Sequence, residues 1–457
     1  MKIYNTLKKQ KEEFQPLVPG EVSMYTCGVT VYDDCHIGHA RSMYVFEVMR
    51  NYFQYRGYRV RFVRNITDID DKILNKALAL SQKEKIDITE AWDRVVSVNI
   101  DNYRKDAASL GLREPEHEPK ASDYVDKIII FINRIIDNGY AYESDGSVYF
   151  RTRKYADNTG AYGILSGRKI DELYSNVRKG EDSAKEEAAD FVLWKAEKAN
   201  EIAWPSPWGP GRPGWHIECS VMSTDILGET FDIHGGGLDL VFPHHENEIS
   251  QSRAATGKEY ARYWLHHGLL SVEKQKMSKS LGNFVTIQKI LEDYSSDILK
   301  LFFLQAAYGS TIDYSISRMD EAGRAYLKIL DLKQRIDRLT PGKGSDNTFR
   351  TAFESAMDDD FNMPKALAVL FNMASSADIK GTKELFYRIC AVFGFDFVLR
   401  KRRLLISEDD ILLKLNARKE AKANRDYAAA DRIRDELTGL GVVIKDCPGG
   451  LTEWEYA

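Results

Sequence analysis

The residue types best suited to chemistry in this chain are thiols, imidazoles and carboxylates at spacings that could hold a metal ion. His244 and Glu248 are four residues apart, so on a helix they would share one face. Cys27 and Cys219 could approach them from separate strands or turns. A set of two thiolates, one imidazole and one carboxylate suits Zn²⁺. Spacing alone leaves two alternative donors near these positions, His245 and Cys35.

Two short strings have the composition of phosphate-binding segments. In the string HIGH at residues 36–39, the histidines are three apart, and at a helix start both rings point the same way. Gly38 leaves room for a flat base, and the amino end of a helix offers free amides to phosphate oxygens. The lysines of KMSKS at residues 276–280 could clamp a pyrophosphate. Either string could arise by chance, but the two together predict an ATP-using enzyme.

These residues need a framework that brings distant segments together. A buried strand is predicted over 23–30, a helix after His39 that ends near Gly57, and a second strand from Arg59. Strand, helix and strand within about forty residues form a βαβ unit, which predicts a parallel sheet with nucleotide at its carboxyl edge. A further strand is predicted over 231–234, before three glycines, and a helix over 244–254.

The composition excludes several classes of protein. With 457 residues, 43% of them hydrophobic and 29% charged, the chain is globular and long enough for two to four domains. The 69 acidic residues outnumber the 64 basic ones, which disfavours nonspecific polyanion binding but permits a local basic face for RNA. Five cysteines, an odd number, argue against a disulfide framework. Because no signal core or membrane-length apolar run is present, a cytoplasmic location is expected.

Longer strings give the chain a specific resemblance. It resembles the class I aminoacyl-tRNA synthetases and, more narrowly, the bacterial-type cysteinyl-tRNA synthetases. The strings that match are MYTCGVTVYDDCHIGHARS from residue 24, VRNITDIDDKI from 63, GRPGWHIECS from 211, FDIHGGGLDLVFPHHENEI from 231 and KMSKSLGNF from 276. The similarity continues through MDDDFNMPKAL near residue 357 to the end of the chain.

The resemblance implies one zinc site per chain in the amino-acid pocket. Its metal ligands align with Cys27, Cys219, His244 and Glu248. A zinc ion there would bind the thiolate of substrate L-cysteine and reject the harder, less acidic hydroxyl of serine. Other pocket residues would be Cys27 itself, Thr67, Trp215 and His234, although Trp215 could equally belong to the core and His234 could satisfy a strand end.

The resemblance also implies the reaction. The carboxylate of cysteine would attack the α-phosphate of ATP, which Mg²⁺ accompanies, and the adenylate would then pass its aminoacyl group to tRNA(Cys). The catalytic residues implied are His36, His39, Lys276 and Lys279. The residues implied for ATP are His36, Gly38, His39, Lys279, the glycines Gly236 and Gly237, and Asp239 for the ribose.

The remainder of the chain is expected to bind RNA. Asp431, Asp446 and Trp454 resemble positions that read the anticodon, since carboxylates accept from base amino groups and an aromatic ring stacks on a base. Glu455 departs from the family pattern, which often has a basic residue there. A monomer without membrane contact is expected.

The predicted fold class is α/β, with a Rossmann-like parallel-sheet catalytic domain and a connective insertion. A helical stem-contact and anticodon-binding region follows, and then a small C-terminal α+β module. The expected segments are the first catalytic half (1–114), the insertion (115–200), the second catalytic half (201–275), the KMSKS loop with the stem-contact region (276–345), the helical anticodon-binding domain (346–405) and the last module (406–457).

Three alternatives remain open at this stage. One is the related ligase that joins cysteine to a glucosaminyl-inositol in mycothiol synthesis, which has no use for an anticodon module. Another is a catalytically silent RNA-binding relative, which would be expected to lack a signature histidine or lysine. The third is a purely structural metal site.

Overall fold

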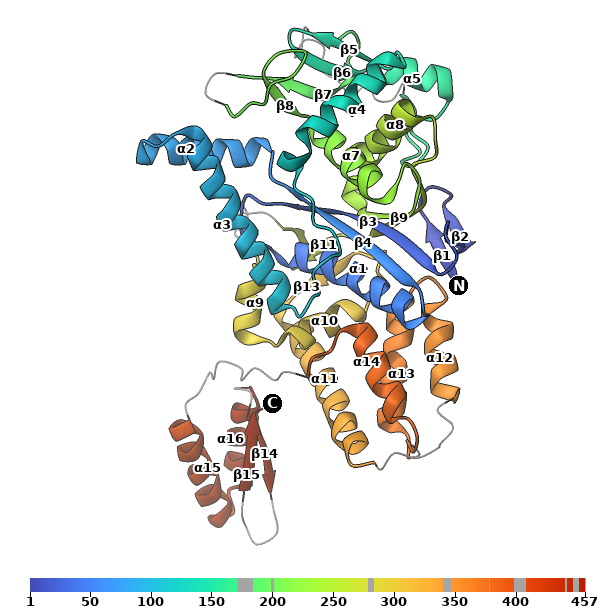
Figure 1. The fold of residues 1–457 in the computed structure, drawn as a ribbon. Coiled ribbons are helices and arrows are strands. Elements are labelled where there is room, and N and C mark those ends of the chain that lie inside the picture. Colours follow the sequence, from blue (N-terminus) through green and yellow to red (C-terminus); the bar gives the residue numbers. More distant parts are fainter. Residues whose placement is uncertain are drawn as a thin grey trace.

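The computed structural model describes residues 1–170, 184–198, 201–277, 283–339, 347–377, 379–397, 408–439, 442–446 and 452–456. Within them the side chains form three hydrophobic clusters. One fills one side of the central sheet and the helical region, and the second fills the other side of the sheet and the insertion. The third, small cluster belongs to the C-terminal module, which lies at one end of the molecule (Figure 1).

The centre of the molecule is a four-stranded parallel sheet with strand order β10-β9-β3-β4. The strands are β3 (Glu21–Thr30), β4 (Arg59–Thr67), β9 (Phe231–Gly237) and β10 (Ala261–His267). Both faces are covered: Met24 on β3 belongs to one cluster, and its neighbour Tyr25 belongs to the other. Since successive strand residues point to opposite faces, a strand buried on both sides reads as a continuous apolar run. The predicted Rossmann-like α/β fold is confirmed.

The predicted βαβ unit is also confirmed. Helix α1 (Ile37–Tyr55) connects β3 to β4 and contacts β3, β4 and β9. Strand β9 is longer than predicted, because it continues through the three glycines instead of ending at His234. A Cβ on Gly235 would lie 2.3 Å from the ring of Phe46, so glycine lets α1 pack closely on the strand.

The helix α7 (Trp215–Leu227) is the main element that the sequence pattern did not indicate. Cys219 therefore comes from a helix, and the prediction of a strand or turn there is wrong. The reason is burial on several sides: α7 contacts β3, β4, α4 and α8, so even Ser220 and Ser223 are buried. A helix that is buried nearly all round lacks the apolar stripe by which helices are predicted.

The helix that was predicted from His244 begins slightly later. Val241–His245 (η3) form a kinked turn, because Phe242 inside it has extended dihedral angles (φ −141°, ψ 132°), and this turn leads into α8 (Glu246–Thr256). His244 thus stands in the turn and Glu248 in the first turn of α8, still four residues apart.

The insertion carries its own antiparallel sheet, with strand order β5-β6-β7-β8. The last of these strands, Gly211–Pro213, lies beyond residue 200 yet pairs with β7. The elements of this region are η1 (Ala121–Tyr124), α4 (Val125–Asp137), β5 (Ala141–Ser144), β6 (Ser147–Phe150), α5 (Thr152–Thr159), β7 (Phe191–Ala196) and β8 (Gly211–Pro213).

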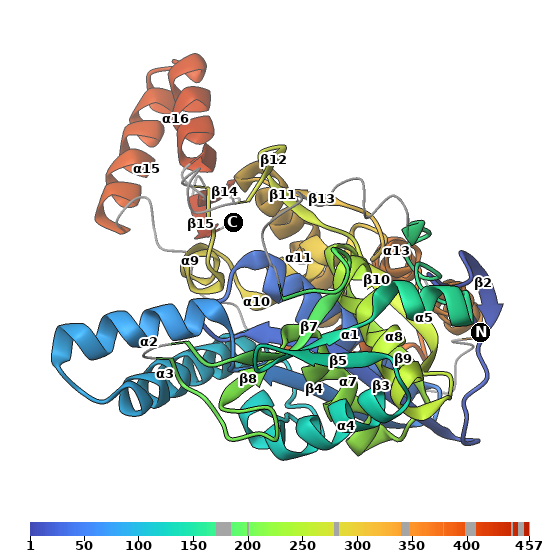
Figure 2. The same ribbon diagram turned by 90° about the horizontal axis from the view of Figure 1, so that it is seen from above.

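Smaller elements surround the sheet. A helical hairpin follows β4 and projects from the molecule, as Figure 2 shows from above. The two helices of this hairpin are α2 (Asp71–Glu84) and α3 (Ile88–Ser109). The other small elements are β1 (Lys2–Asn5), β2 (Gln10–Glu13), η2 (Leu238–Leu240), β11 (Leu270–Val272), β12 (Gln275–Lys276) and β13 (Ile312–Tyr314).

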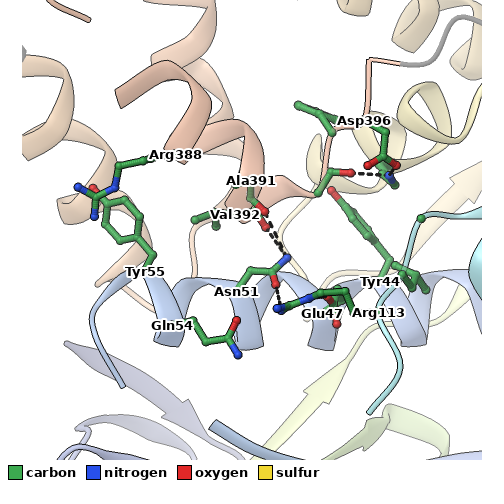
Figure 3. A pocket seen from close by; sticks show the side chains of 15 residues that line it. Tyr44, Glu47, Asn51, Gln54, Tyr55, Arg113, Arg388, Ala391, Val392 and Asp396 are labelled. Atoms are coloured by element: carbon green, nitrogen blue, oxygen red, sulfur yellow. Dashed lines mark hydrogen bonds and ion pairs between the residues drawn. The ribbon is translucent and has the colours of Figure 1, made fainter. Parts of the chain in front are cut away.

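The helical region packs against the outer side of α1. Its helices are α9 (Ile287–Asp293), α10 (Ser296–Leu304), α11 (Ile316–Asp337), α12 (Asn347–Met357), α13 (Met363–Ser375) and α14 (Lys383–Phe393). Tyr44 and Asn51 of α1 donate to Phe393 O and Val392 O at the end of α14, over 2.8 and 3.1 Å. An open pocket of about 630 Å³ lies at this junction (Figure 3), away from the residues predicted to do chemistry.

The C-terminal module consists of α15 (Glu408–Ala423), α16 (Tyr427–Gly439) and the antiparallel pair β14 (Val442–Asp446) and β15 (Thr452–Tyr456). Its α+β character agrees with the prediction. In the part of the chain that the structure describes, no helix is both long and apolar enough to span a lipid bilayer.

Candidate active site

The four predicted metal ligands converge at the carboxyl edge of the parallel sheet. Cys27 on β3 and Cys219 on α7 place their Sγ atoms 3.8 Å apart. Glu248 Oε1 lies 3.5 Å from Cys27 Sγ and 3.1 Å from His244 Nε2. One donor atom from each of the four residues lies within 4.8 Å of every other.

These spacings fit a tetrahedral zinc ion. Zinc–sulfur bonds of about 2.3 Å at tetrahedral angles put two sulfur ligands about 3.8 Å apart, and sulfur and oxygen ligands about 3.6 Å apart. The observed separations of 3.8 and 3.5 Å match both values. The two cysteines are free, and their sulfur separation is far from the 2.0 Å of a disulfide, so the thiols are available to a metal.

A local irregularity of the sheet points Cys27 at the other donors. The register between β3 and β4 shifts between Thr26 and Val29, as in a β-bulge. The Asn65 side chain of β4 accepts a hydrogen bond from Gly28 N over 2.7 Å and so holds the bulge. A Cβ on Gly28 would lie 1.5 Å from Asn65 O, so only glycine fits.

A second possible donor set overlaps the first, sharing Cys27 and Glu248 but using His234 and His245. His245 Nε2 lies 3.3 Å from Cys27 Sγ, and its Nδ1 lies 2.8 Å from His266 Nε2. His234 stacks on Trp264 at 4.4 Å and contacts Glu248 Oε2 over 2.8 Å. The set with two thiolates suits a soft metal better, which leaves His245 and His234 to orient the ligands. Cys35 joins neither set.

Buried neighbours orient the candidate ligands and tune their charge. Tyr260 donates to Glu248 Oε2 over 3.0 Å, so the other oxygen faces the cysteines. Burial opposes ionisation of Glu248, but the adjacent imidazoles of His234 and His244 hold its pKa below the usual range. The hydrogen bond from Cys27 lowers the pKa of Cys219 to about 6, whereas burial raises that of Cys27. One ready thiolate in a buried site favours a cation.

The residues predicted to line the amino-acid pocket surround this cluster. Trp215, the first residue of α7, is 41% exposed and stacks on the ring of His244 at 4.3 Å. It is therefore not part of the core, and its role in lining the amino-acid pocket stays a prediction. Thr67 ends β4, is buried, and accepts a hydrogen bond from Asn65 Nδ2 over 3.1 Å. His234 is fully buried, and it contacts the candidate metal ligands by way of its hydrogen bond with the Glu248 carboxylate.

The histidines of the first signature form a stacked pair at the start of α1. Their ring centroids lie 3.6 Å apart, so the prediction that they point the same way is confirmed. His36 caps α1: its Nδ1 accepts from Gly38 N and His39 N, and His39 Nδ1 accepts from His36 N. Burial lowers the pKa of His36 to about 4 and that of His39 to about 3, so both rings are neutral at pH 7. Each ring then carries its proton on Nε2 and presents one donor.

Met277 of the second signature lies close to the first signature, since a Cβ on Gly38 would lie 3.8 Å from Met277 Cε. The backbone of Lys276 ends β12, but residues 278–282, including Lys279, are outside the described part of the chain. After this segment the chain returns to α1, where Ile37 N donates to Val285 O and Ile287 N donates to Cys35 O, each over 3.0 Å.

The predicted nucleotide contacts at the end of β9 and just beyond it have packing reasons as well. A Cβ on Gly236 would lie 2.6 Å from the His245 ring, and one on Gly237 would lie 2.3 Å from Asp239 Oδ1. Asp239 itself is exposed at the mouth of the site, and its charge acts on His36 and His267. Close approach of an adenylate to the two glycines stays a prediction.

Comparison with known proteins decides the family. Residues 13–324 match the family model described as "tRNA synthetases class I (C) catalytic domain", and residues 352–397 match a DALR domain. Residues 414–453 match a "Cysteinyl-tRNA ligase anticodon binding domain". A cysteine–tRNA ligase of Hahella chejuensis is 43% identical over 479 residues and covers 100% of both chains. One of Chromohalobacter salexigens is 45% identical over 99% of each chain.

The chain belongs to the cysteine–tRNA ligase family. It is therefore an aminoacyl-tRNA synthetase, and its partners are a tRNA, an amino acid and ATP. The anticodon-binding domain argues against the ligase of mycothiol synthesis, which has no use for such a module.

Solved structures agree on the fold. A methionyl-tRNA synthetase of Mycobacterium tuberculosis, in complex with methionyl-adenylate, has a TM-score of 0.60 at 16% identity and covers 82% of this chain and 89% of its own. A putative arginyl-tRNA synthetase of Campylobacter jejuni has a TM-score of 0.54 at 13% identity and covers 81% and 91%.

The candidate anticodon residues of this cysteine–tRNA ligase occupy different surroundings. Arg418 donates to both carboxylate oxygens of Asp446 over 2.8 and 2.9 Å, and Lys422 adds a contact at 2.7 Å. These donors hold the pKa of Asp446 far below its usual range. Asp431 is exposed, and Trp454 packs partly against the small core. A base that bonds to Asp446 would therefore have to share the carboxylate with two cations.

Three residues important for the site were missed from the sequence. Asn65 contacts three parts of the site. Its side chain forms hydrogen bonds with Gly28 N in the bulge and with Thr67, and its Oδ1 lies 3.8 Å from Cys219 Sγ. Tyr260 and His266 support Glu248 and His245 from β10 and the residue before it. Only Asn65 carried a signal, because it lies in the string VRNITDIDDKI that supports the resemblance.

Proposed function

We propose that this ligase activates L-cysteine as cysteinyl-adenylate and transfers it to tRNA(Cys), with a zinc ion selecting the thiol over the serine hydroxyl. The observation that carries the proposal is the convergence of Cys27, Cys219, His244 and Glu248 at tetrahedral spacing beside Trp215. When bound, zinc supplies a soft Lewis acid that accepts a thiolate and gains little from a hydroxyl. The chain would hold one zinc ion, and Mg²⁺ would accompany ATP.

The surrounding residues would position the amino acid for reaction. Trp215 stands at the open side of the cluster and would cover the cysteine side chain, and Thr67 would border the pocket from the end of β4. The pocket lies at the carboxyl edge of the sheet, where open α/β sheets bind their ligands. The carboxylate of cysteine would thereby face the start of α1.

The first signature would bind the phosphates without adding charge. His36 and His39 each present one Nε2–H donor, and the amino end of α1 adds positive potential. Lys276 and Lys279 would supply the positive charge that the departing pyrophosphate needs. Attack of a carboxylate on the α-phosphate needs no proton transfer, so positioning and electrostatics carry this step.

Replacing Lys279 by alanine is expected to lower the rate of adenylate formation far more than the affinity for cysteine. The lysine would act on charge that develops in the transition state, so kcat should fall by about 100- to 1000-fold while the KM for cysteine changes little. The measurement is cysteine-dependent ATP–pyrophosphate exchange. An exchange rate like that of the unmodified enzyme would refute the role of the second signature.

Deleting the C-terminal module, residues 408–457, is expected to impair tRNA charging and to spare ATP–pyrophosphate exchange. The core of this module is separate from the other two, so its removal leaves them covered. Each lost base contact costs about 1–3 kcal/mol, so two or three together would lower kcat/KM for tRNA by about 30-fold or more. Equal loss of charging and exchange would contradict a role in reading tRNA.

A further inference from the structure

A buried arginine close to the first signature has an unusual set of partners. The side chain of Arg41 on α1 is 1% exposed. Its Nη1 donates to Gly268 O and Leu269 O over 2.8 and 2.7 Å, and its Nη2 donates to Tyr308 O and Ser310 O over 3.0 and 2.5 Å. Four backbone carbonyls therefore surround one guanidinium, and among the described residues no carboxylate forms an ion pair with it.

The four carbonyls belong to two segments that enter neighbouring parallel strands. Gly268 and Leu269 lead directly into β11, whereas Tyr308 and Ser310 precede β13, which pairs with β11. The segments touch so closely that a Cβ on Gly268 would lie 2.1 Å from Ser310 O. Strand β11 turns back as β12, and β12 ends at Lys276, the first residue of the second signature.

The described segments on either side of the second signature are thus attached to α1 or to the residues just before it. Before the loop, Arg41 holds the segments from which β11 and β13 start. After the loop, Ile37 N donates to Val285 O and Ile287 N donates to Cys35 O. The guanidinium comes from the second turn of α1, and the two backbone bonds involve Ile37, the first residue of α1, and Cys35 just before it.

We propose that Arg41 is a positioning residue that clamps the start of the β11–β12 hairpin, which leads into the second signature, to α1, which carries the first. The inference rests on the proposed role of the second signature in adenylate formation. The hairpin is short, and β12 has only two residues, so its own backbone pairing holds it weakly. The clamp supplies the rigidity that a charge-stabilising loop requires.

Only arginine can make this clamp. Its planar guanidinium offers five donors in a fixed fork, and four acceptors are taken here by its two terminal nitrogens. Lysine has three donors on a single atom and cannot reach two pairs of carbonyls at once. Burial lowers the pKa of Arg41 to about 10, which leaves the group charged at pH 7. A charge buried without a carboxylate is costly, so a positioning task accounts for its presence.

The test compares Arg41→Lys and Arg41→Met with Arg50→Met in the full-length enzyme. Arg50 is a matched control because it lies on the same helix and is also buried, but it pairs with Glu47 and Glu116. We expect both Arg41 variants to lower kcat of ATP–pyrophosphate exchange by about 100-fold with little change in the KM for cysteine, since a displacement of about 1 Å costs that much. Hydrogen exchange of the amides of 270–276 should quicken in these variants. Arg50→Met should have a lower thermal stability, but the hydrogen exchange of its amides in 270–276 should be as slow as in the unmodified enzyme.

The outcomes separate this inference from the proposed function. Unchanged kcat in both Arg41 variants, or equal losses in Arg50→Met, would overturn the clamp even if Lys279→Ala is inactive. If Lys279→Ala retains full activity, the proposed role of the second signature is refuted, independently of the result for the Arg41 variants. A third outcome is faster amide hydrogen exchange in 270–276 of the Arg41 variants with an unchanged kcat. It would show that Arg41 holds the hairpin without serving catalysis, and this outcome would also overturn the proposal.

Discussion

Replacing Cys219 by alanine is expected to remove the zinc ion and most of the discrimination between cysteine and serine. The three remaining donors would bind zinc weakly, because a structural or substrate-binding site of this kind depends on its thiolates. A pocket that relies on size alone discriminates by about 10- to 200-fold, whereas specific bonding reaches about 10⁴- to 10⁵-fold. The ratio of kcat/KM for cysteine to that for serine should therefore fall by at least about 50-fold, mainly through loss of cysteine activation.

The measurement is ATP–pyrophosphate exchange with each amino acid, together with the metal content of the purified protein. Cys390→Ala is the matched control, since Cys390 is also a buried free thiol but lies in α14, away from the donor cluster. It should keep both the metal and the ratio. A zinc-free Cys219→Ala enzyme that still rejects serine like the unmodified enzyme would end the proposal of selection by metal.

Cobalt substitution distinguishes a substrate-binding metal from a structural one. If the metal takes the substrate thiol, adding cysteine to the cobalt enzyme should strengthen the thiolate-to-cobalt charge-transfer absorption, and adding serine should not. If the metal only supports the fold, neither amino acid changes the spectrum, and the discrimination must arise elsewhere in the pocket.

Replacing His36 by asparagine is expected to separate the two roles of this histidine. Its Nδ1 caps α1 by accepting from Gly38 N and His39 N, and asparagine is among the best residues for that position. The Nε2 donor, however, would be lost. Because removal of one donor to a developing anion costs about 10²- to 10³-fold in rate, kcat of exchange should fall about 100-fold with little change in melting temperature.

His36→Ala is the companion variant. It loses the cap as well as the donor, so it should be less stable than His36→Asn by about 1 kcal/mol and equally slow. The free energy of unfolding and the exchange rate are measured for both variants. An Asn variant with the activity of the unmodified enzyme would show that the imidazole serves the helix and not the nucleotide.

The relation between sequence and structure differs from element to element. The βαβ unit was predictable because β3, α1 and β4 follow one another and their periodicities are local. The stacked histidines were predictable for the same reason, since three residues at a helix start determine their relative direction. Helix α7 was not predictable, because its surroundings come from β3, β4, α4 and α8, and only burial by all of them makes its polar residues compatible with a core.

By itself, the sequence determined the family and the α/β class, and it supplied the residues that we propose to carry the chemistry. These depend on short strings and on spacings within single elements, where covalent connection dictates geometry. Only the tertiary structure decided which donors meet: Cys27 reaches Cys219, 192 residues away, through a bulge held by Asn65. It likewise excluded Cys35 from the donor sets and gave Arg41 its four carbonyls. Contacts of this kind arise when sheet and helices pack, and no local pattern encodes the distance between two segments that the fold brings together.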